Sequence, residues 1–213
     1  MKGILFKPDV WQAKKKVLEQ YGEAQTRRLV NPQPTFGDGA WGWQTGKSYG
    51  VVGISSNVEK VFCQSLIEHS RYQVGEVVYR KEAWRIINPI GKYFHNPYDF
   101  GIEYLSINHE VKWWTDNGNL MDYPIDEKVR SPLFLPEKYA RDFLQITAVR
   151  AERLQEITDE DAIAEGCLET RERVGNGIHW ESPRGNYCLL WDSINKEYTW
   201  DKNPWVWVYT LSL

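Results

Sequence analysis

The C-terminal segment from Trp205 to Leu211 restricts the fold of this chain more than any other part of the sequence. Large apolar side chains occupy every second position, with Trp205, Trp207, Tyr209 and Leu211 alternating with Val206, Val208 and Thr210. Successive side chains of a β-strand point to opposite faces, so this pattern predicts a strand that is buried on one face or on both. We therefore expect the chain to fold around a β-sheet.

Further strands and helices are predicted along the chain. Strands are predicted at residues 4–6, 49–54, 76–81 and 143–154, and helices after Pro8, after Thr158 and near Tyr187. Residues 35–50, which are rich in Gly and Trp, are predicted to form a loop. Strands outnumber helices and no regular strand-helix-strand rhythm occurs, so the sequence predicts an α+β domain around a mixed or barrel-like sheet.

The helix after Pro8 has an apolar face that the residue spacing defines. Its apolar positions are Val10, Ala13, Val17, Leu18 and Tyr21, which recur at helical spacing. The basic run at residues 14–16 is therefore predicted to lie largely on the outer side of this helix. Gly22 is predicted to end it.

Length and composition limit the class of protein. The 213 residues carry a formal net charge of -3, and 42% of them are hydrophobic, which predicts one folded domain and excludes the general basic field of a DNA-coating protein. No apolar run approaches the roughly 20 residues of a membrane span, and the first ten residues lack the apolar centre of a signal peptide. We therefore expect a cytoplasmic protein that has no membrane contact.

The cysteines and histidines do not form a recognisable metal motif. Cys63, Cys167 and Cys188 are an odd and widely spaced set, which fits a reducing cytosol and supports neither a disulfide framework nor a zinc knuckle. The pair His109-Glu110 lacks the second histidine that a zinc-binding HExxH motif requires. We expect no metal site and no cofactor.

Two polar segments are candidates for a functional site. The first is Glu23-Ala24-Gln25-Thr26-Arg27-Arg28, which offers a hydroxyl and two guanidinium groups just after the predicted first helix. The second is the short helix that Thr158 is predicted to cap and Gly166 to end, with Glu165 in its last turn. A partly desolvated carboxyl at this position can donate a proton, whereas the alternative is an ordinary solvated glutamate at a helix end.

Several segments occur in an informative order along the chain. They are Ile4-Leu5-Phe6, Gln25-Thr26-Arg27-Arg28, residues 75–84, residues 146–154, residues 157–166, residues 190–195 and Asn203-Pro204-Trp205-Val206-Trp207-Val208. This order resembles the ASCH group of the PUA-like superfamily, and more closely its phage- and prophage-encoded members. Residues 35–73 and 88–130 match poorly and are interpreted as insertions in a single domain that spans residues 1–213.

The resemblance implies a fold and a chemistry. The implied fold is a PUA-like mixed β-barrel with flanking helices and a cleft suited to RNA or a nucleoside. Some small bacterial members of the family are amidohydrolases that remove the acetyl group from the exocyclic amine of cytidine, using a lysine, a threonine three residues later and a glutamate in a short helix. By position, the threonine falls on Thr26 and the glutamate on Glu165, whereas the lysine falls on Glu23.

The preferred hypothesis is a binding protein of phage or prophage origin. Its predicted ligand is RNA, single-stranded nucleic acid or a modified nucleoside, and its predicted contacts are Arg27, Arg28 and Gln25. A second possibility is a phage accessory or morphogenesis protein that binds another protein through the Trp-rich insertion at residues 88–130.

The alternative hypothesis is an amidohydrolase acting on N4-acetylcytidine. Thr26 would be the nucleophile, Glu165 the general acid, and Glu23 would occupy the position of the activating lysine. A threonine hydroxyl needs a base, and Glu23 is a poor replacement for an amine, so binding is predicted ahead of catalysis. A lysine from residues 14–16, or Lys81, could supply the amine in space.

Overall fold

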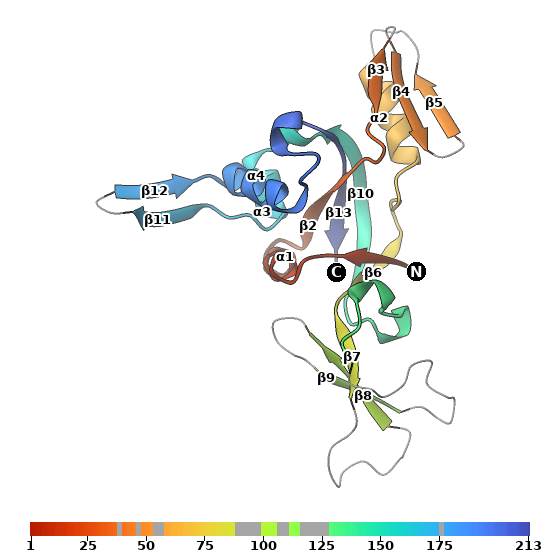
Figure 1. Cartoon of the computed structure of the whole chain (residues 1–213), viewed down its shortest axis with the longest axis vertical. Helices are drawn as coiled ribbons and strands as arrows, with labels where there is room; N and C mark the ends of the chain where they lie inside the picture. The colour runs from red at the N-terminus through yellow and green to blue at the C-terminus, as the bar shows by residue number, and fades with distance from the viewer. Residues whose placement is uncertain are drawn as a thin grey trace. The chain divides into compact units, whose positions relative to one another are not determined.

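The computed structural model describes residues 1–37, 40–45, 48–52, 58–87, 99–105, 111–115, 128–174 and 177–213. These residues form α-helices, short 3-10 helices and several β-sheets, which confirms the predicted α+β class (Figure 1). The chain divides into two compact units. The first unit contains Met1–Gln12 and Val77–Leu144, and the second contains Ala13–Glu76 and Gln145–Leu213. The PUA-like barrel and the single-domain organisation stay predictions.

The first unit holds a parallel strand pair and an antiparallel sheet. The strands β1 (Lys2–Leu5) and β6 (Val77–Lys81) pair in parallel, which agrees with the strands predicted at residues 4–6 and 76–81. The strands β7 (Trp84–Ile87), β8 (Asp99–Tyr104) and β9 (Val111–Thr115) form the antiparallel sheet. Two 3-10 helices follow, η1 (Pro132–Phe134) and η2 (Glu137–Tyr139). The core of this unit consists of Trp84, Ile86, Ile102, Tyr104, Leu135 and Tyr139.

The second unit is built on three antiparallel strands. The C-terminal strand β13 (Trp205–Ser212) lies between β10 (Phe143–Arg153) and β2 (Glu23–Leu29), as Figure 1 shows. Both faces of β13 are covered. Val206 and Val208 join the buried cluster that also contains Ala162, Tyr187 and Trp191. The two faces confirm the buried strand that the alternation of residues 205–211 predicts.

The opposite face of β13 is covered by aromatic contacts. The ring of Trp205 meets Phe62 at a centroid distance of 5.5 Å, and Tyr209 meets Tyr72 at 5.2 Å. Phe62 belongs to α2 (Val58–Glu68), and the Nε1 of Trp207 donates to the carbonyl of Leu66 in the same helix. Residues 35–50 were predicted as a loop, and this prediction is wrong. The described residues of this range lie in β3 (Thr35–Gly37), β4 (Ala40–Thr45) and the start of β5 (Ser48–Val52), which overlaps the strand predicted at residues 49–54. These three strands satisfy one another's backbone hydrogen bonds across an antiparallel sheet.

The helices after Pro8 and after Thr158 begin and end where the sequence predicts, whereas the helix α2 was not predicted. The helix α1 (Pro8–Tyr21) is followed by Gly22, whose φ is 80°, and α3 (Asp159–Ala164) is followed closely by Gly166, whose φ is 96°. Glycine adopts this left-handed conformation at little cost. The Thr158 hydroxyl accepts a hydrogen bond from the backbone N–H of Asp161 at 3.1 Å, which confirms the predicted cap.

The remaining elements of the second unit follow β10 in sequence. They are η3 (Leu154–Glu156), the hairpin strands β11 (Thr170–Val174) and β12 (Gly177–Glu181), α4 (Pro183–Ile194) and η4 (Trp200–Lys202). No helix among the described residues is long and apolar enough to cross a membrane. Residues 88–98, 106–110 and 116–127 of the predicted Trp-rich insertion, including His109-Glu110, lie outside the described residues.

Candidate functional site

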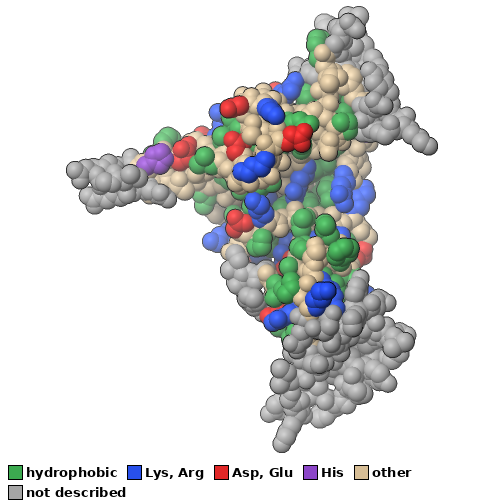
Figure 2. All heavy atoms as spheres, viewed as in Figure 1, with side chains coloured by type: hydrophobic (Ala, Val, Ile, Leu, Met, Phe, Trp, Pro, Cys, Tyr) green, Lys and Arg blue, Asp and Glu red, His purple; other side chains and the backbone are tan. Residues whose placement is uncertain are grey.

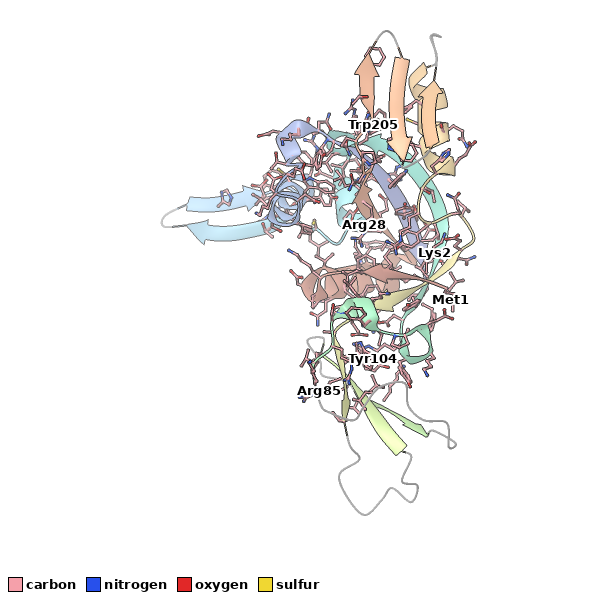
Figure 3. All side chains as sticks on the ribbon, turned by 45° about the vertical axis from the view of Figure 1, so that its right-hand side comes forward. Met1, Lys2, Arg28, Arg85, Tyr104 and Trp205 are labelled. Carbon is pink, nitrogen blue, oxygen red and sulfur yellow. The ribbon has the colours of Figure 1, made fainter. Side chains whose placement is uncertain are left out.

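Strand β2 carries most of the predicted site residues, and its pleat divides them between two faces. Gln25 and Arg27 lie on one face, and Thr26 and Arg28 lie on the other, because successive side chains of a strand point in opposite directions. The register pairs Thr26 with Tyr209 and Arg28 with Trp207 on β13. Arg28 is labelled in Figure 3.

A buried lysine joins β2 to the end of α3. The ammonium Nζ of Lys14 lies 2.6 Å from Oε2 of Glu165 and donates to the Glu165 backbone carbonyl at 2.9 Å. The same Nζ donates to the backbone carbonyl of Gln25. These bonds use the three donors of an ammonium group. Lys14 is 1% exposed and Glu165 is 4% exposed, so the structure encloses this ion pair.

The position of Lys14 corrects the prediction that the basic run at residues 14–16 lies on the outer side of α1. Lys15 and Lys16 are exposed, but Lys14 is buried. Lys14 stands three and four positions before the buried residues Val17 and Leu18, so it belongs to the same helix face. Its aliphatic stem fits that face, and its ammonium group finds partners in β2 and α3.

A close approach of α1 and α3 makes this contact possible. A Cβ atom on Gly166 would stand 2.8 Å from the Cβ of Ala13, the residue before Lys14. Glycine at position 166 therefore allows the end of α3 to lie directly against α1. This approach places the carboxylate of the neighbouring Glu165 within hydrogen-bond distance of the Lys14 ammonium.

Arg27 is the centre of a second set of ion pairs. Its NH2 group lies 2.8 Å from Oε1 of Glu152 and 2.9 Å from Oδ2 of Asp161, and its NH1 group lies 3.4 Å from Oε1 of Glu165. The Arg27 side chain is 0% exposed. Burial acts against the charge of Arg27, but the Glu165 and Glu152 carboxylates outweigh it and raise the pKa of the guanidinium.

Arg150 completes these contacts from β10. It stands opposite Val208, which in turn stands opposite Arg27, so the two arginines flank one buried valine across three strands. Arg150 binds Oε2 of Glu152 at 2.7 Å and both oxygens of Asp161 at 2.9 Å. The side-chain oxygen of Gln25 accepts hydrogen bonds from both arginines at 3.3 Å. We call Lys14, Gln25, Arg27, Arg150, Glu152, Asp161 and Glu165 the β2 charge network.

The formal charges of the network balance, and the pKa values of Lys14, Arg27 and Asp161 reflect both burial and the neighbouring charges. Its three cations and three carboxylates cancel formally. On the face of the molecule that Figure 2 shows, Lys and Arg side chains are also interspersed with Asp and Glu. Burial lowers the pKa of the Lys14 ammonium, although the Glu165 carboxylate opposes this effect. Burial alone would raise the pKa of Asp161, but Arg27, Gln25 and Arg150 lower it.

Thr26 lies beside the network but is not bonded to it. Its residue is 3% exposed, and among the described residues no hydrogen bond joins its hydroxyl to Lys14 or Glu165. The Lys14 ammonium binds the Gln25 carbonyl, which belongs to the same peptide group as the N–H of Thr26. The catalytic roles of Thr26 and Glu165 stay predictions, although the same lysine binds the carbonyl of Gln25, which precedes Thr26, and the carboxylate of Glu165.

Glu23 lies away from the network. It is exposed at the start of β2, where it accepts a hydrogen bond from the Thr147 hydroxyl at 3.4 Å. It also lines a pocket between α1 and α3. The structure therefore brings Gln25, Arg27 and Glu165 together, holds Thr26 and Arg28 on the other face of β2, and leaves Glu23 outside.

Three members of the network were not singled out as site residues from the sequence: Arg150, Glu152 and Asp161. Lys14 was named only as one of several lysines that could supply an amine. The helical spacing of Lys14 from Val17 and Leu18 was a usable signal. Arg150 and Glu152 stand two positions apart in a predicted strand, which places them on one face, and this too was a usable signal. Among the described residues, no group of three or more His, Cys, Asp or Glu side chains is arranged to hold a metal ion.

Comparisons with known proteins identify no relative of this chain. No protein-family model, no curated protein and no solved structure matches the chain.

Proposed function

We propose that this chain is an ASCH-type, PUA-like protein that binds RNA, single-stranded nucleic acid or a modified nucleoside beside strand β2. The observation that carries the proposal is the bridge from the Lys14 ammonium to the Gln25 carbonyl and the Glu165 carboxylate. This bridge brings together residues 25–28 and 157–166, two of the segments on which the family resemblance rests. A phage or prophage origin remains part of the proposal.

The proposal divides the predicted nucleic-acid contacts by their exposure. Arg27 is fully enclosed and engaged by Glu152, Asp161 and Glu165, so we assign it a positioning role. Gln25 is half-buried, but its side-chain oxygen is held by Arg27 and Arg150, so we assign it a positioning role as well. We assign the direct contact with the ligand to the half-buried Arg28, because a guanidinium group can bind a phosphate or a base edge.

A titration with labelled RNA, single-stranded DNA and free nucleosides tests the proposal. We expect saturable and salt-sensitive binding that Arg28→Ala weakens by about tenfold, with a smaller dependence on salt. Arg171→Ala is the matched control, because Arg171 is 69% exposed in β11 and pairs with Glu169. Binding that is absent, or that Arg28→Ala and Arg171→Ala reduce equally, would contradict the proposal.

A second function is favoured by one specific observation, which is the amine of Lys14. An N4-acetylcytidine amidohydrolase needs a base beside Thr26. The Nζ of Lys14 donates to the carbonyl of the peptide group that joins Gln25 to Thr26. Burial lowers the pKa of Lys14, which increases the fraction of neutral amine that can accept a proton. Lys14 thus replaces Glu23 as the candidate base in this second proposal.

Chromatography of cytidine released from N4-acetylcytidine tests the second function. We expect Thr26→Ala, Glu165→Gln and Lys14→Met each to remove turnover, whereas Lys15→Met, at the exposed neighbouring position, retains it. No turnover by the parent protein would eliminate this function and leave the binding proposal in place. A protein partner for residues 88–130 stays a prediction, because most of that segment lies outside the described residues.

A further inference from the structure

A pocket of about 280 Å³ lies between α1 and α3 in the second unit. Its lining consists of Val17, Tyr21, Glu23, Glu160, Ile163 and Ala164. Val17 is buried and Ile163 and Ala164 are half-buried, so these three side chains give the pocket an apolar inner wall. The volume is near the lower end of the range for pockets that bind small molecules.

The helix contacts explain why the pocket exists. Gly166 allows the end of α3 to contact α1 at Ala13. Four and eight positions later on the same face of α1, Val17 and Tyr21 line the pocket, opposite the short side chain of Ala164. The pocket thus belongs to the same helix packing that holds Lys14 against Glu165, but three of its lining residues, Tyr21, Glu23 and Glu160, are exposed.

Both charged residues of the pocket are acidic. Glu23 and Glu160 are exposed, and the six residues that line the pocket include no Lys or Arg. Glu23 accepts a long hydrogen bond of 3.4 Å from Thr147, and Glu160 makes no ion pair with any described residue. Two carboxylates beside an apolar wall favour a ligand that has a positive charge at one end and an apolar stem at the other.

Tyr21 adds a third feature that suits a cation. Its side chain is 60% exposed, and its hydroxyl accepts a hydrogen bond of 2.9 Å from Gln20. An aromatic face attracts an ammonium group through the cation–π interaction. An anionic ligand would instead be repelled by Glu23 and Glu160.

We propose that this pocket binds a small amphipathic cation, namely a primary ammonium group on an aliphatic stem. The stem lies against Val17, Ile163 and Ala164, and the ammonium group lies between the Glu23 and Glu160 carboxylates. This site is separate from the nucleic-acid contacts proposed above, because its charge excludes phosphate. It also gives Glu23 a role other than that of a replaced catalytic lysine.

Three probes that share one stem test the proposal on the chain of 213 residues. We propose to titrate hexylammonium, hexanol and hexanoate while following the methyl signals of Ile163 by NMR spectroscopy. We expect hexylammonium to shift these signals saturably and to bind about fivefold or more tightly than hexanol, with no binding of hexanoate. Equal affinity for hexylammonium and hexanol, or binding of hexanoate, would overturn the proposal, and so would Ile163 signals that do not move.

Charge-neutralising variants separate the role of the carboxylates from that of the apolar wall. The double variant Glu23→Gln with Glu160→Gln is expected to reduce hexylammonium affinity to that of hexanol. Glu19→Gln, at an exposed position of α1 outside the pocket, is the matched control and should bind as the parent does. A double variant that binds hexylammonium like the parent would overturn the proposal. Because no nucleic acid is used, either outcome leaves the RNA titration independent.

Discussion

The Lys14 ammonium lies 2.6 Å from the Glu165 carboxylate, although 151 positions separate the two residues in the chain. Lys14 is also the donor that satisfies the Gln25 carbonyl, so one side chain joins α1, β2 and the end of α3. Removing one partner of a buried ion pair leaves the other charge without its counterion. Replacing either Lys14 or Glu165 alone is therefore expected to destabilise the second unit strongly.

Lys14→Met should destabilise the protein by about 3 kcal/mol, because the Gln25 carbonyl and the Glu165 carboxylate both lose a buried donor. The free energy of unfolding from urea denaturation measures this loss. Lys15→Met is the control, and its exposed position predicts a change within about 0.5 kcal/mol. A loss for Lys14→Met as small as that of the control would show that the ion pair does not stabilise the fold.

A double-mutant cycle isolates the pair itself. Lys14→Met combined with Glu165→Gln should cost less than the sum of the two single changes, because the second substitution removes the charge that the first leaves without its partner. We expect a coupling of roughly 1–3 kcal/mol from the same urea measurements. Strictly additive losses would contradict a coupling between Lys14 and Glu165 and would leave Arg27 as the counterion of Glu165.

Gly166→Ala and Gly22→Ala compare backbone strain with steric contact. Both glycines have positive φ, 96° and 80°, so both substitutions should cost about 1 kcal/mol in strain. An added Cβ at Gly22 meets nothing within 4 Å, whereas at Gly166 it would stand 2.8 Å from Ala13. Gly166→Ala should therefore lower the free energy of unfolding by at least about 1 kcal/mol more than Gly22→Ala. Equal losses would mean that α1 and α3 separate without cost.

Local patterns predicted the elements whose determinants are close together in sequence. The alternation of residues 205–211 predicted β13, and Thr158 with Gly166 bounded α3. By contrast, β3 and β4 were predicted as a loop, because glycines and polar residues interrupt their sequences and the strands are held by pairing, whereas β5 overlaps the strand predicted at residues 49–54. Their pairing partners decide their conformation.

The site was predicted less completely than the fold for a related reason. Gln25, Arg27 and Glu165 were identified, and they do meet. Lys14 was assigned to the outer face of its helix together with Lys15 and Lys16, because only the spacing of the apolar residues was used to define the inner face. The partner that makes its burial favourable follows α3, far along the chain. Helical periodicity indicates which face of α1 is buried, but it does not identify the Glu165 carboxylate that compensates the charge of Lys14.

Arg27→Lys should be a destabilising substitution despite its conserved charge. The planar guanidinium of Arg27 contacts Glu152, Asp161 and Glu165 at once through different nitrogen atoms. The single nitrogen of a lysine ammonium group cannot reproduce this geometry. We expect a loss of about 2–4 kcal/mol in thermal or urea unfolding. Arg171→Lys, at a 69% exposed position, should change stability by less than about 0.5 kcal/mol. Similar losses for both variants would contradict the central position of Arg27.

Cys167 should make the protein less stable at alkaline pH. Burial, with a smaller effect of Glu165, raises the pKa of its thiol from 9.0 to about 11. The folded state therefore holds this proton more tightly than the unfolded state, so the stabilisation is complete below pH 9 and is lost as the pH rises toward 11.

The size of this effect is on the order of 2 kcal/mol, and Cys167→Ala should remove it. Urea denaturation at pH 8 and at pH 10.5 measures the difference between the parent and the variant, and the opposite titration of Lys14, whose pKa burial lowers, is present in both proteins. The same buried thiol should react slowly with a disulfide reagent at pH 8, because little thiolate is present. Parallel pH profiles for the two proteins, or rapid labelling of Cys167 in the folded state, would show that the thiol is not enclosed beside Glu165.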